Sequence, residues 1–358
     1  MTSRIGIAGI GIEIHGETLV ISSQRVLRVL SSAVLNGGLT TSRAIINHHV
    51  PKGVHSLRPE RYLNRVLRKR GLEPNSIGLM TAVDIRNVSI INHTKFRPRL
   101  SVVVTAGVSN AMAAGDDAKH FRERTGTINM ILILDGNPTD ACLIEIVKTA
   151  TEAKALTLRE LDILSRASNR IATGTSTDTV TVASTCRGEP IKYAGTATVL
   201  GSTISRYVIR AVKEAVRKQD GISPDRLLVE RLKDRGVTSK QLAKTVSQRL
   251  SVRLSVKPKR QFLLRMESQT RRVLQKTDIA SMILASLKMC EDASTSPNSM
   301  CMARGAGASI AYLIGGEAGR SEFQKTSSNW KRALSELVVE GILSGLIAEA
   351  VKPTRSEG

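Results

Sequence analysis

A hydroxyl group stands directly before an apolar run in the first half of the chain. Thr127 follows Gly126 and precedes Asn129–Leu134, and the turn-forming sequence Asp135-Gly136-Asn137-Pro138 ends the run. An apolar run bounded in this way is typical of a fully buried strand. A residue at the end of such a strand keeps its geometry, as a nucleophile must. Thr127 is therefore our first catalytic candidate, with a β-branched residue that merely opens the strand as the alternative.

Five clusters of small and polar residues offer further chemical groups. Their glycines let backbone N–H groups approach a ligand closely, and the neighbouring hydroxyls can donate or attack. Ordinary turns use the same residue types, so no single cluster identifies a site. The clusters are residues 36–38, 105–110, 126–127, 149–154 and 172–178.

Two adjacent histidines, His48 and His49, invite comparison with a metal site. Consecutive residues of a strand point to opposite faces, so we do not expect both to bind one metal. We expect one of them to contact substrate and choose His48. All six histidines lie at or before His120, which excludes a histidine-based metal site from the C-terminal region.

The composition points to a folded protein with a strongly basic surface. The 358 residues are 41% hydrophobic, enough for one large or two ordinary domains, and the net charge is +22. Such a charge attracts polyanions. Aromatic residues make up only 3% and no nucleic-acid-binding motif is visible, so nucleic acid is not expected as the main partner. An anionic substrate or a solvated basic surface accounts for the charge.

Four widely spaced cysteines without a Cys-x-x-Cys pair favour a reducing cytoplasm. The N-terminus lacks the apolar core of a signal peptide, and no apolar run is long enough to cross a bilayer.

The secondary-structure pattern of the sequence changes near residue 217. Before it, β-rich runs alternate with helical patterns; after it, helix formers dominate. We therefore expect an α+β fold, with a layered sheet-and-helix catalytic domain over residues 1–217, αββα being one arrangement, and a smaller all-α domain over residues 218–358. Expected strands are 5–14, 18–22, 78–83, 100–106, 129–134 and 180–184; expected helices are 140–164, 202–216, 239–250, 266–292 and 334–351.

The order and the amino-acid sequences of the polar clusters resemble those of the adenosylcobinamide amidohydrolase (CbiZ) family over residues 13–215. The likeness rests on LNGG, VVVTAGVSNAMAAGDD, TGTINMILILD, KTATEAKALTLREL, ATGTSTDTVTVAS and YAGTATVLG. It implies a hydrolase of corrinoid salvage in archaeal style, which removes aminopropanol from adenosylcobinamide and leaves adenosylcobyric acid. It also implies a corrinoid partner and no cofactor of the protein's own, because the substrate itself carries cobalt and an adenosyl group.

A fainter resemblance links the same region to the ornithine acetyltransferase and DmpA-type self-processing hydrolases. It rests on Thr127 and Asp135, on ThrAlaGlyVal from Thr105 and on GlyThrSerThrAsp from Gly174. It implies that Thr127 attacks the amide after cleavage of the Gly126–Thr127 bond, with the freed α-amine as general base. Without cleavage a side chain must take the proton.

These arguments yield one set of expected site residues. Glu152 and Asp178 are the side-chain base candidates beside Thr127, with a surface carboxylate and a turn cap as their structural alternatives. Backbone N–H groups near Gly107 are expected to hold the oxyanion. The expected substrate-binding residues are Asn36, Gly37, Gly38, His48, Thr105, Ser109, Asn110, Asp116 and Thr175, and no metal site is expected.

In the C-terminal region, LLVERLKDRGVTSKQLAKTVSQRL followed by VLQKTDIASMILASLKMCEDA faintly resembles a phosphatidylglycerophosphatase-A-like helical fold. The acidic cluster of such a metal-dependent phosphatase is missing, so we expect a structural helical domain, with homo-oligomerisation as an open role. The alternative to an enzyme is a binding module that holds a phosphorylated or nucleotide-bearing ligand in the glycine-rich loops without turning it over.

Overall fold

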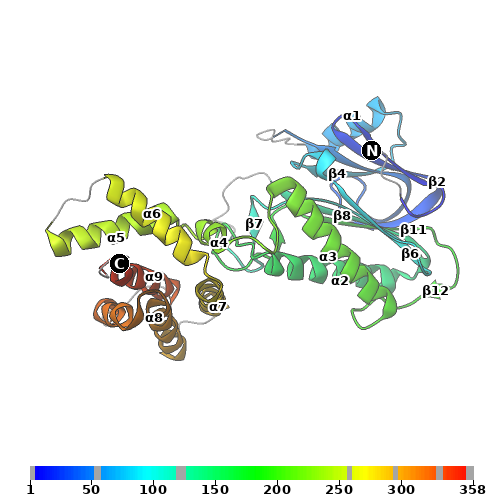
Figure 1. The fold of residues 1–358 in the computed structure, drawn as a ribbon. Helices are drawn as coiled ribbons and strands as arrows, with labels where there is room; N and C mark the ends of the chain where they lie inside the picture. The colour runs from blue at the N-terminus through cyan, green and yellow to red at the C-terminus, as the bar shows by residue number, and fades with distance from the viewer. Residues whose placement is uncertain are drawn as a thin grey trace. The chain divides into compact units, whose positions relative to one another are not determined.

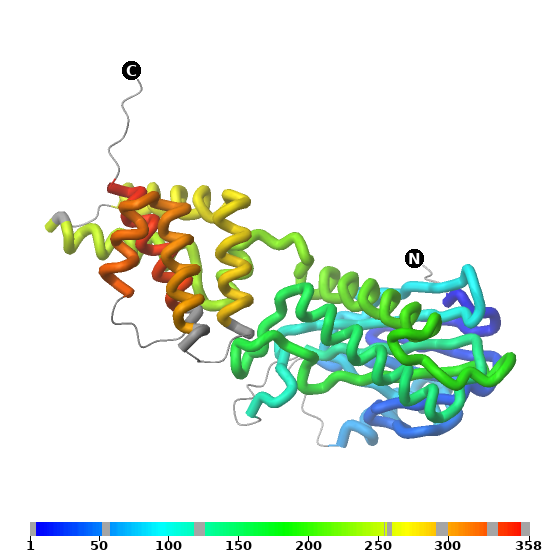
Figure 2. Tube along the Cα trace, turned by 90° about the horizontal axis from the view of Figure 1, so that it is seen from below, coloured from blue at the N-terminus to red at the C-terminus, as the bar shows by residue number. Residues whose placement is uncertain are grey.

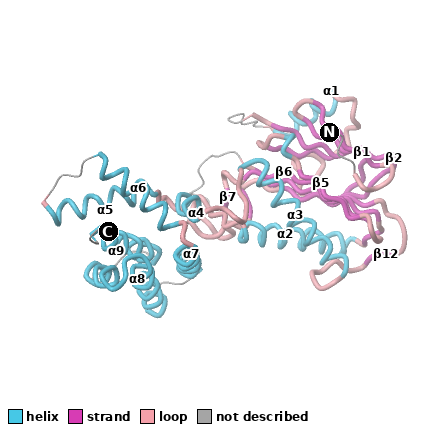
Figure 3. Tube along the Cα trace, viewed as in Figure 1, coloured by secondary structure: helices cyan, strands magenta, loops and turns pink. Residues whose placement is uncertain are grey.

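The computed structural model describes residues 5–51, 58–117, 126–255, 260–292, 297–327 and 334–351. It divides into two compact units, unit 1 up to Pro224 and unit 2 from Asp225. The expected boundary after residue 217 falls inside a helix that continues to Asp220 and ends at Gly221, whose φ of 70° suits glycine. Strands occur in unit 1, and the described part of unit 2 consists of helices and loops (Figure 3), so the expected α+β class is confirmed.

One mixed sheet of eight strands dominates unit 1 (Figure 1). Seven strands follow the order β4-β3-β2-β11-β8-β6-β5, and β1 pairs with β2. The pairs β3–β4 and β8–β11 are parallel, and the other pairs are antiparallel. The strands are β1 (Ile10–His15), β2 (Thr18–Ser31), β3 (Gly38–His49), β4 (Ile77–Thr81), β5 (Ser89–His93), β6 (Arg99–Gly107), β8 (Thr127–Asp135) and β11 (Thr179–Ser184).

Short elements complete unit 1. Two small ladders join β7 (Ala111–Met112) to β10 (Gly174–Thr175) and β9 (Asn137–Pro138) to β12 (Pro190–Ile191). The helices are α1 (Pro59–Lys69), α2 (Asp140–Glu160) and α3 (Val199–Asp220), with a 3-10 turn η1 at Ile85–Asn87. Thr139 and Thr198 begin α2 and α3 by accepting hydrogen bonds from backbone N–H groups of the first turn.

β8 is buried on both faces, as its apolar sequence predicts. Ile128 and Met130 face α2 and α3, whereas Ile131 and Ile133 face an inner core shared with β2, β3 and β4. A third core lies between α1 and the opposite face of β2 and β3. The layers therefore run from α1 through β2–β4 to β5, β6, β8 and β11, and then to α2 and α3, which is an αββα arrangement made by one rolled sheet.

The segment between β2 and β3 closes the roll. The backbone N–H of Ser32 donates to the carbonyl of Val180 on β11 (3.0 Å), and Leu35 pairs with Gly78 on β4. Asn36 has a φ of 56°, and its amide donates to the carbonyls of Pro74 and Ser76. This segment holds β4 close to β8 and β11.

Unit 2 is a helical unit, and Figure 2 shows α8 and α9 packed side by side. Close approach is possible because Gly307 faces Gly341, and Gly315 and Gly319 face Gly345. Thr238 and Gln241 form a capping box at the start of α5. The helices are α4 (Leu228–Asp234), α5 (Ser239–Leu254), α6 (Arg260–Leu274), α7 (Thr277–Asp292), α8 (Pro297–Ser327, interrupted at Gly316) and α9 (Leu334–Val351). Among the helices of the described ranges, none has the length and hydropathy needed to cross a membrane.

Candidate active site

Thr127 is the first residue of β8 and is 5% exposed. Its Oγ1 lies 2.6 Å from Oγ1 of Thr177, and the Thr177 hydroxyl is also 3.1 Å from the carbonyl oxygen of Gly126, to which it can donate. Asp135 is the residue that, with Thr127, carried the resemblance to the self-processing hydrolases. It lies at the opposite end of the same strand and accepts a hydrogen bond from Thr185 (2.9 Å). The polar groups near Thr127 therefore come from other segments.

The backbone around Thr127 is packed too tightly for a side chain at position 126. A Cβ on Gly126 would collide with Oδ1 of Asn110 and lie 2.7 Å from the carbonyl oxygen of Gly107 and 3.1 Å from the nitrogen of Ser109. Gly107 pairs with Thr127 across β6 and β8. These contacts bring the expected residues Gly107, Ser109 and Asn110 to the start of β8. The Asn110 amide also donates to Oγ of Ser176 (2.9 Å).

Asp178 acts as a clamp between β8, α2 and the preceding turn. Its oxygens accept hydrogen bonds from the backbone N–H groups of Ile128 (3.1 Å) and Thr175 (3.0 Å) and from the Thr175 hydroxyl, and they form an ion pair with Lys154 of α2. Lys154 and Asp178 are both largely buried in this pair. A carboxylate with this many donors is poorly placed to take a proton from Thr127.

Three other expected site residues also have structural environments. Glu152 is exposed on α2, on the helix-covered side of the sheet. Asp116 accepts hydrogen bonds from the Ala113 backbone (2.8 Å) and from Ser165 (2.5 Å). Burial alone would raise the pKa of Asp116, but the hydrogen bonds from Ser165 and Ser168 outweigh it and hold that pKa below its usual range. Asn36, followed by Gly37 and Gly38, belongs to the segment that closes the roll.

On the inner face of the sheet, a polar cluster replaces the apolar core near Thr127. We call Asn47, Thr105 and Asn129, from β3, β6 and β8, the inner polar cluster. The Asn129 amide donates to Oδ1 of Asn47 (2.9 Å) and to the carbonyl of Met80 (2.8 Å), and the Asn47 amide donates to Oγ1 of Thr105 (2.8 Å). All three residues are at most 2% exposed. In the described part of the chain, Oδ1 of Asn129 is buried without a hydrogen-bond donor.

The strand registers place two reactive side chains on one side of this cluster. Ile45 and Ile131, two residues from Asn47 and Asn129, lie in the inner apolar core. On the side away from this core, His49 lies two residues from Asn47 on β3, and Thr127 lies two residues from Asn129 on β8. Each is about 7 Å along its strand from the cluster residue. Alternation along a strand gives both the same inward face as the cluster. The adjacent pair of histidines marked His49 as well as His48, but the choice of His48 was wrong about which ring faces the cluster; the position of His49 two residues after Asn47 is the signal that could have identified it.

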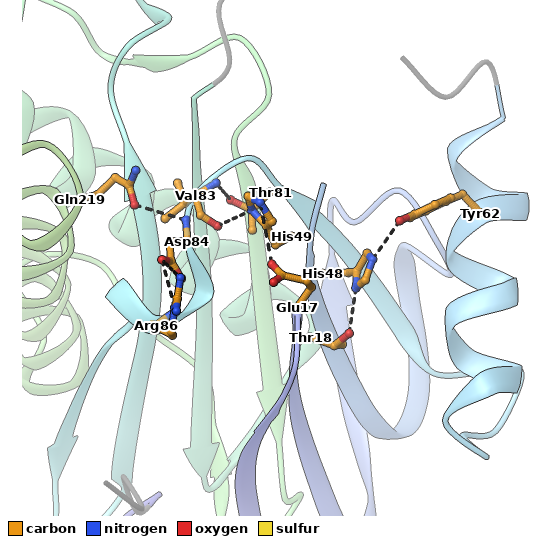
Figure 4. A network of polar contacts seen from close by, with 10 residues as sticks. All are labelled: Glu17, Thr18, His48, His49, Tyr62, Thr81, Val83, Asp84, Arg86 and Gln219. Carbon is orange, nitrogen blue, oxygen red and sulfur yellow. Dashed lines mark hydrogen bonds and ion pairs between the residues drawn. The ribbon is translucent and has the colours of Figure 1, made fainter. Parts of the chain in front are cut away.

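His49 has a defined tautomer (Figure 4). Its Nδ1 lies 2.9 Å from the carbonyl oxygen of Val83, and a carbonyl only accepts, so Nδ1 carries the proton. Nε2 of the neutral ring then has a free lone pair and lies 3.8 Å from Oε2 of Glu17. Beside this group, Gln219 of α3 accepts a hydrogen bond from the Asp84 backbone (3.3 Å), which ties α3 to the turn after β4.

His48, the histidine we expected to contact substrate, points to the opposite side of β3. Its Nδ1 is 2.8 Å from the Thr18 hydroxyl, and its Nε2 is 3.1 Å from the hydroxyl of Tyr62 on α1 (Figure 4). Burial, followed by the nearby charges of Arg70 and His49, lowers the pKa of His48. The structure thus places His48 under α1 and away from the inner polar cluster. Over the described ranges, no group of three or more His, Cys, Asp or Glu side chains lies close enough to hold a metal ion.

A comparison with protein families matches unit 1. The model of the adenosylcobinamide amidohydrolase (CbiZ) family matches residues 7–224. An adenosylcobinamide amidohydrolase of Methanosarcina mazei is 34% identical over 209 residues, which are 56% of this chain and 94% of that protein. An uncharacterised protein of Methanocaldococcus jannaschii is 30% identical over 230 residues, 58% of this chain and 88% of its own.

Two further similarities are more limited. An adenosylcobinamide amidohydrolase of Halobacterium salinarum is 35% identical over 138 residues, 35% of this chain and 54% of that protein. A Pyrococcus horikoshii protein of known crystal structure covers 59% of this chain and 82% of its own at 12% identity, but the TM-score of 0.30 is too low to support an argument.

Proposed function

The chain belongs to the adenosylcobinamide amidohydrolase family and is a hydrolase that acts on an amide, and we propose that its substrate is adenosylcobinamide. The products are adenosylcobyric acid and aminopropanol. One observation carries the proposed site: Thr127 and His49 extend from the same side of the inner polar cluster, within the range that the family model matches. We further propose that the protein works in a reducing cytoplasm, which its four free cysteines support.

In the proposed reaction, Oγ of Thr127 attacks the carbonyl carbon of the amide. A bond forms between this oxygen and the carbon, the C–N bond breaks, and the departing amine takes the proton that the hydroxyl lost. Water then hydrolyses the resulting ester and restores the hydroxyl. The sum is one amide and one water giving one acid and one amine, without a redox step.

Backbone donors at the end of β6 are suited to the negative charge that develops on the carbonyl oxygen. Gly107 lies directly opposite Thr127. The N–H of Val108, by contrast, already donates to Oδ2 of Asp220 (2.8 Å). The expected oxyanion donors are therefore N–H groups at or before Gly107.

Two groups compete for the role of general base. One is the α-amine of Thr127, available if the Gly126–Thr127 bond is cleaved; its reference pKa of about 7.7–8.0 suits neutral solution. The other is Nε2 of His49, which needs no cleavage. Asp178 and Glu152 fit the role less well, because the first already accepts several hydrogen bonds and the second is exposed on α2.

The central test measures aminopropanol released from adenosylcobinamide. We expect Thr127→Ala to lower the turnover by about 10³-fold or more, since removal of a nucleophile eliminates the covalent route. Thr177→Val is the matched control: it removes the neighbouring hydroxyl but leaves the nucleophile, and turnover should fall by about tenfold at most. A wild-type protein that binds the corrinoid but releases no amine is instead a binding module. Wild-type turnover in Thr127→Ala would overturn the proposed nucleophile.

A denaturing gel and one variant separate the two bases. The amine mechanism expects two fragments divided at residue 126 in the active protein, and turnover that survives His49→Gln. The histidine mechanism expects one intact band, and a fall of about 10²-fold in His49→Gln. An intact band together with unchanged turnover in His49→Gln would reject both.

A further inference from the structure

Unit 2 carries a concentrated positive charge on α5 and α6. The two helices carry eight lysines and arginines and a single acid, Glu267. That acid is already paired with Arg271 one turn away (2.9 Å). An imbalance of this size creates a local field that attracts anions.

The basic helices are packed against the rest of unit 2. Arg249 of α5 makes a bidentate ion pair with Glu340 of α9, whose side chain is 2% exposed. The distances are 2.5 Å from Nη1 to Oε1 and 2.9 Å from Nη2 to Oε2. Met266, Thr270 and Val273 bury one face of α6. The opposite face of α6 is thereby fixed in an outward position.

That outward face is rich in arginine. It carries Arg260, Leu264, Arg265, Ser268, Arg271 and Arg272, which all are exposed and follow helical spacing. Within the described ranges, Arg260, Arg265 and Arg272 form no ion pair. Their guanidinium groups are available for phosphate oxygens of a partner.

Exposed apolar side chains also occur on α5 and α6. Val252, near the end of α5, is 82% exposed, and Leu264, next to Arg265 near the start of α6, is 60% exposed. Val252 lies two residues before the end of α5, and Leu264 lies four residues after the start of α6. Nucleic-acid phosphates would use the arginines but leave these apolar groups in water. The interface of an anionic membrane accepts both.

We propose that α5 and α6 dock the protein on an anionic lipid surface, with the arginines on phosphate headgroups and Val252 and Leu264 in the acyl boundary. Attachment of this kind is peripheral and needs no membrane-spanning helix. It does not depend on the activity of unit 1.

Sedimentation of the full chain with vesicles tests the charge component. We expect binding to phosphatidylcholine vesicles that contain about one third phosphatidylglycerol, much weaker binding to phosphatidylcholine alone, and loss of binding as salt rises. Arg265→Gln with Arg272→Gln should lower the partition coefficient about 25-fold, on the basis of about fivefold for each arginine. The matched control, Arg304→Gln with Arg320→Gln, removes the same charge from exposed positions of α8 and should change it by about twofold at most.

A second pair of variants separates lipid from nucleic acid. Val252→Ser with Leu264→Ser should lower vesicle binding about tenfold and leave binding to duplex DNA in a mobility-shift assay unchanged. No vesicle binding at low salt, equal binding to neutral vesicles, or equal losses in the α6 and α8 arginine variants would overturn the proposal. So would serine variants that bind vesicles like the wild type, since that result assigns the surface to nucleic acid. Melting curves verify folding, and Thr127→Ala should bind vesicles normally whatever its turnover.

Discussion

The two faces of the sheet near the start of β8 use polar residues in opposite ways. On the helix-covered face, Asp178 is fully engaged by Lys154, Thr175 and the Ile128 backbone. On the inner face, the polar cluster leaves Oδ1 of Asn129 without a donor in the described part of the chain. A buried polar group without a partner costs free energy, so its retention indicates a use other than stability. Asp178 is therefore assigned a structural role, and the inner face, on which Thr127 and His49 also lie, is the candidate site.

The largest expected effect is the loss of stability on removing the Asp178 carboxylate. Asp178→Ala leaves the ammonium group of Lys154 buried without its counter-charge, which should lower the free energy of unfolding by about 3–5 kcal/mol. Thermal or denaturant unfolding measures this. The control is Asp140→Ala, which breaks the more exposed ion pair with Arg28 and should cost about 0–1 kcal/mol. An Asp178→Ala protein with the melting temperature of the wild type but no turnover would make Asp178 catalytic and reverse the comparison.

The inner face should respond in activity more than in stability. Asn129→Ala removes the donor to Asn47 and Met80 beside the nucleophile, and we expect turnover to fall about 10²-fold. The free energy of unfolding should fall by only about 1–3 kcal/mol.

Thr181→Val is the matched control for this inner-face variant. Thr181 is fully buried on the same face of the sheet and bonds to Ser31 (2.7 Å), but it belongs to β11, two residues beyond the level of Asn129. Its turnover should stay close to that of the wild type. Equal turnover losses in Asn129→Ala and Thr181→Val would mean that the inner polar cluster has no special role.

Sequence patterns predicted the elements with strong local signals. The apolar run after Thr127 is a buried strand, and the final helix has the expected bounds, Leu334–Val351. β3 was not predicted, because Thr40, Thr41, Ser42 and Arg43 interrupt its hydrophobic pattern; its buried apolar residues begin at Ala44. The helical stretch expected over 266–292 is two helices that end and begin around Gln275 and Lys276.

The candidate site was only partly predictable for a related reason. Thr127, Gly107, Ser109 and Asn110 meet because they lie at paired strand ends, which local motifs mark. The inner polar cluster depends on the roll of the sheet, which brings β3 over β6 and β8. No local pattern encodes that long-range contact, so Asn47 and Asn129 were missed. The choice between His48 and His49 likewise required the strand's orientation.

The smallest expected effect concerns the histidine on the structural side of β3. The pKa of His48 is lowered in the folded protein, by burial first and then by Arg70 and His49, so folding favours the neutral ring. In the unfolded chain its pKa is about 6.5. The stability that depends on neutral His48 is therefore fully present above about pH 6.5 and is lost as the pH falls toward the lower folded pKa.

Melting temperatures of the wild type and His48→Gln between pH 7.5 and 5.5 measure the difference. We expect the variant to lose less stability on acidification and to keep its turnover at neutral pH. If the two proteins lose stability in parallel while His48→Gln loses turnover, the two histidines exchange roles.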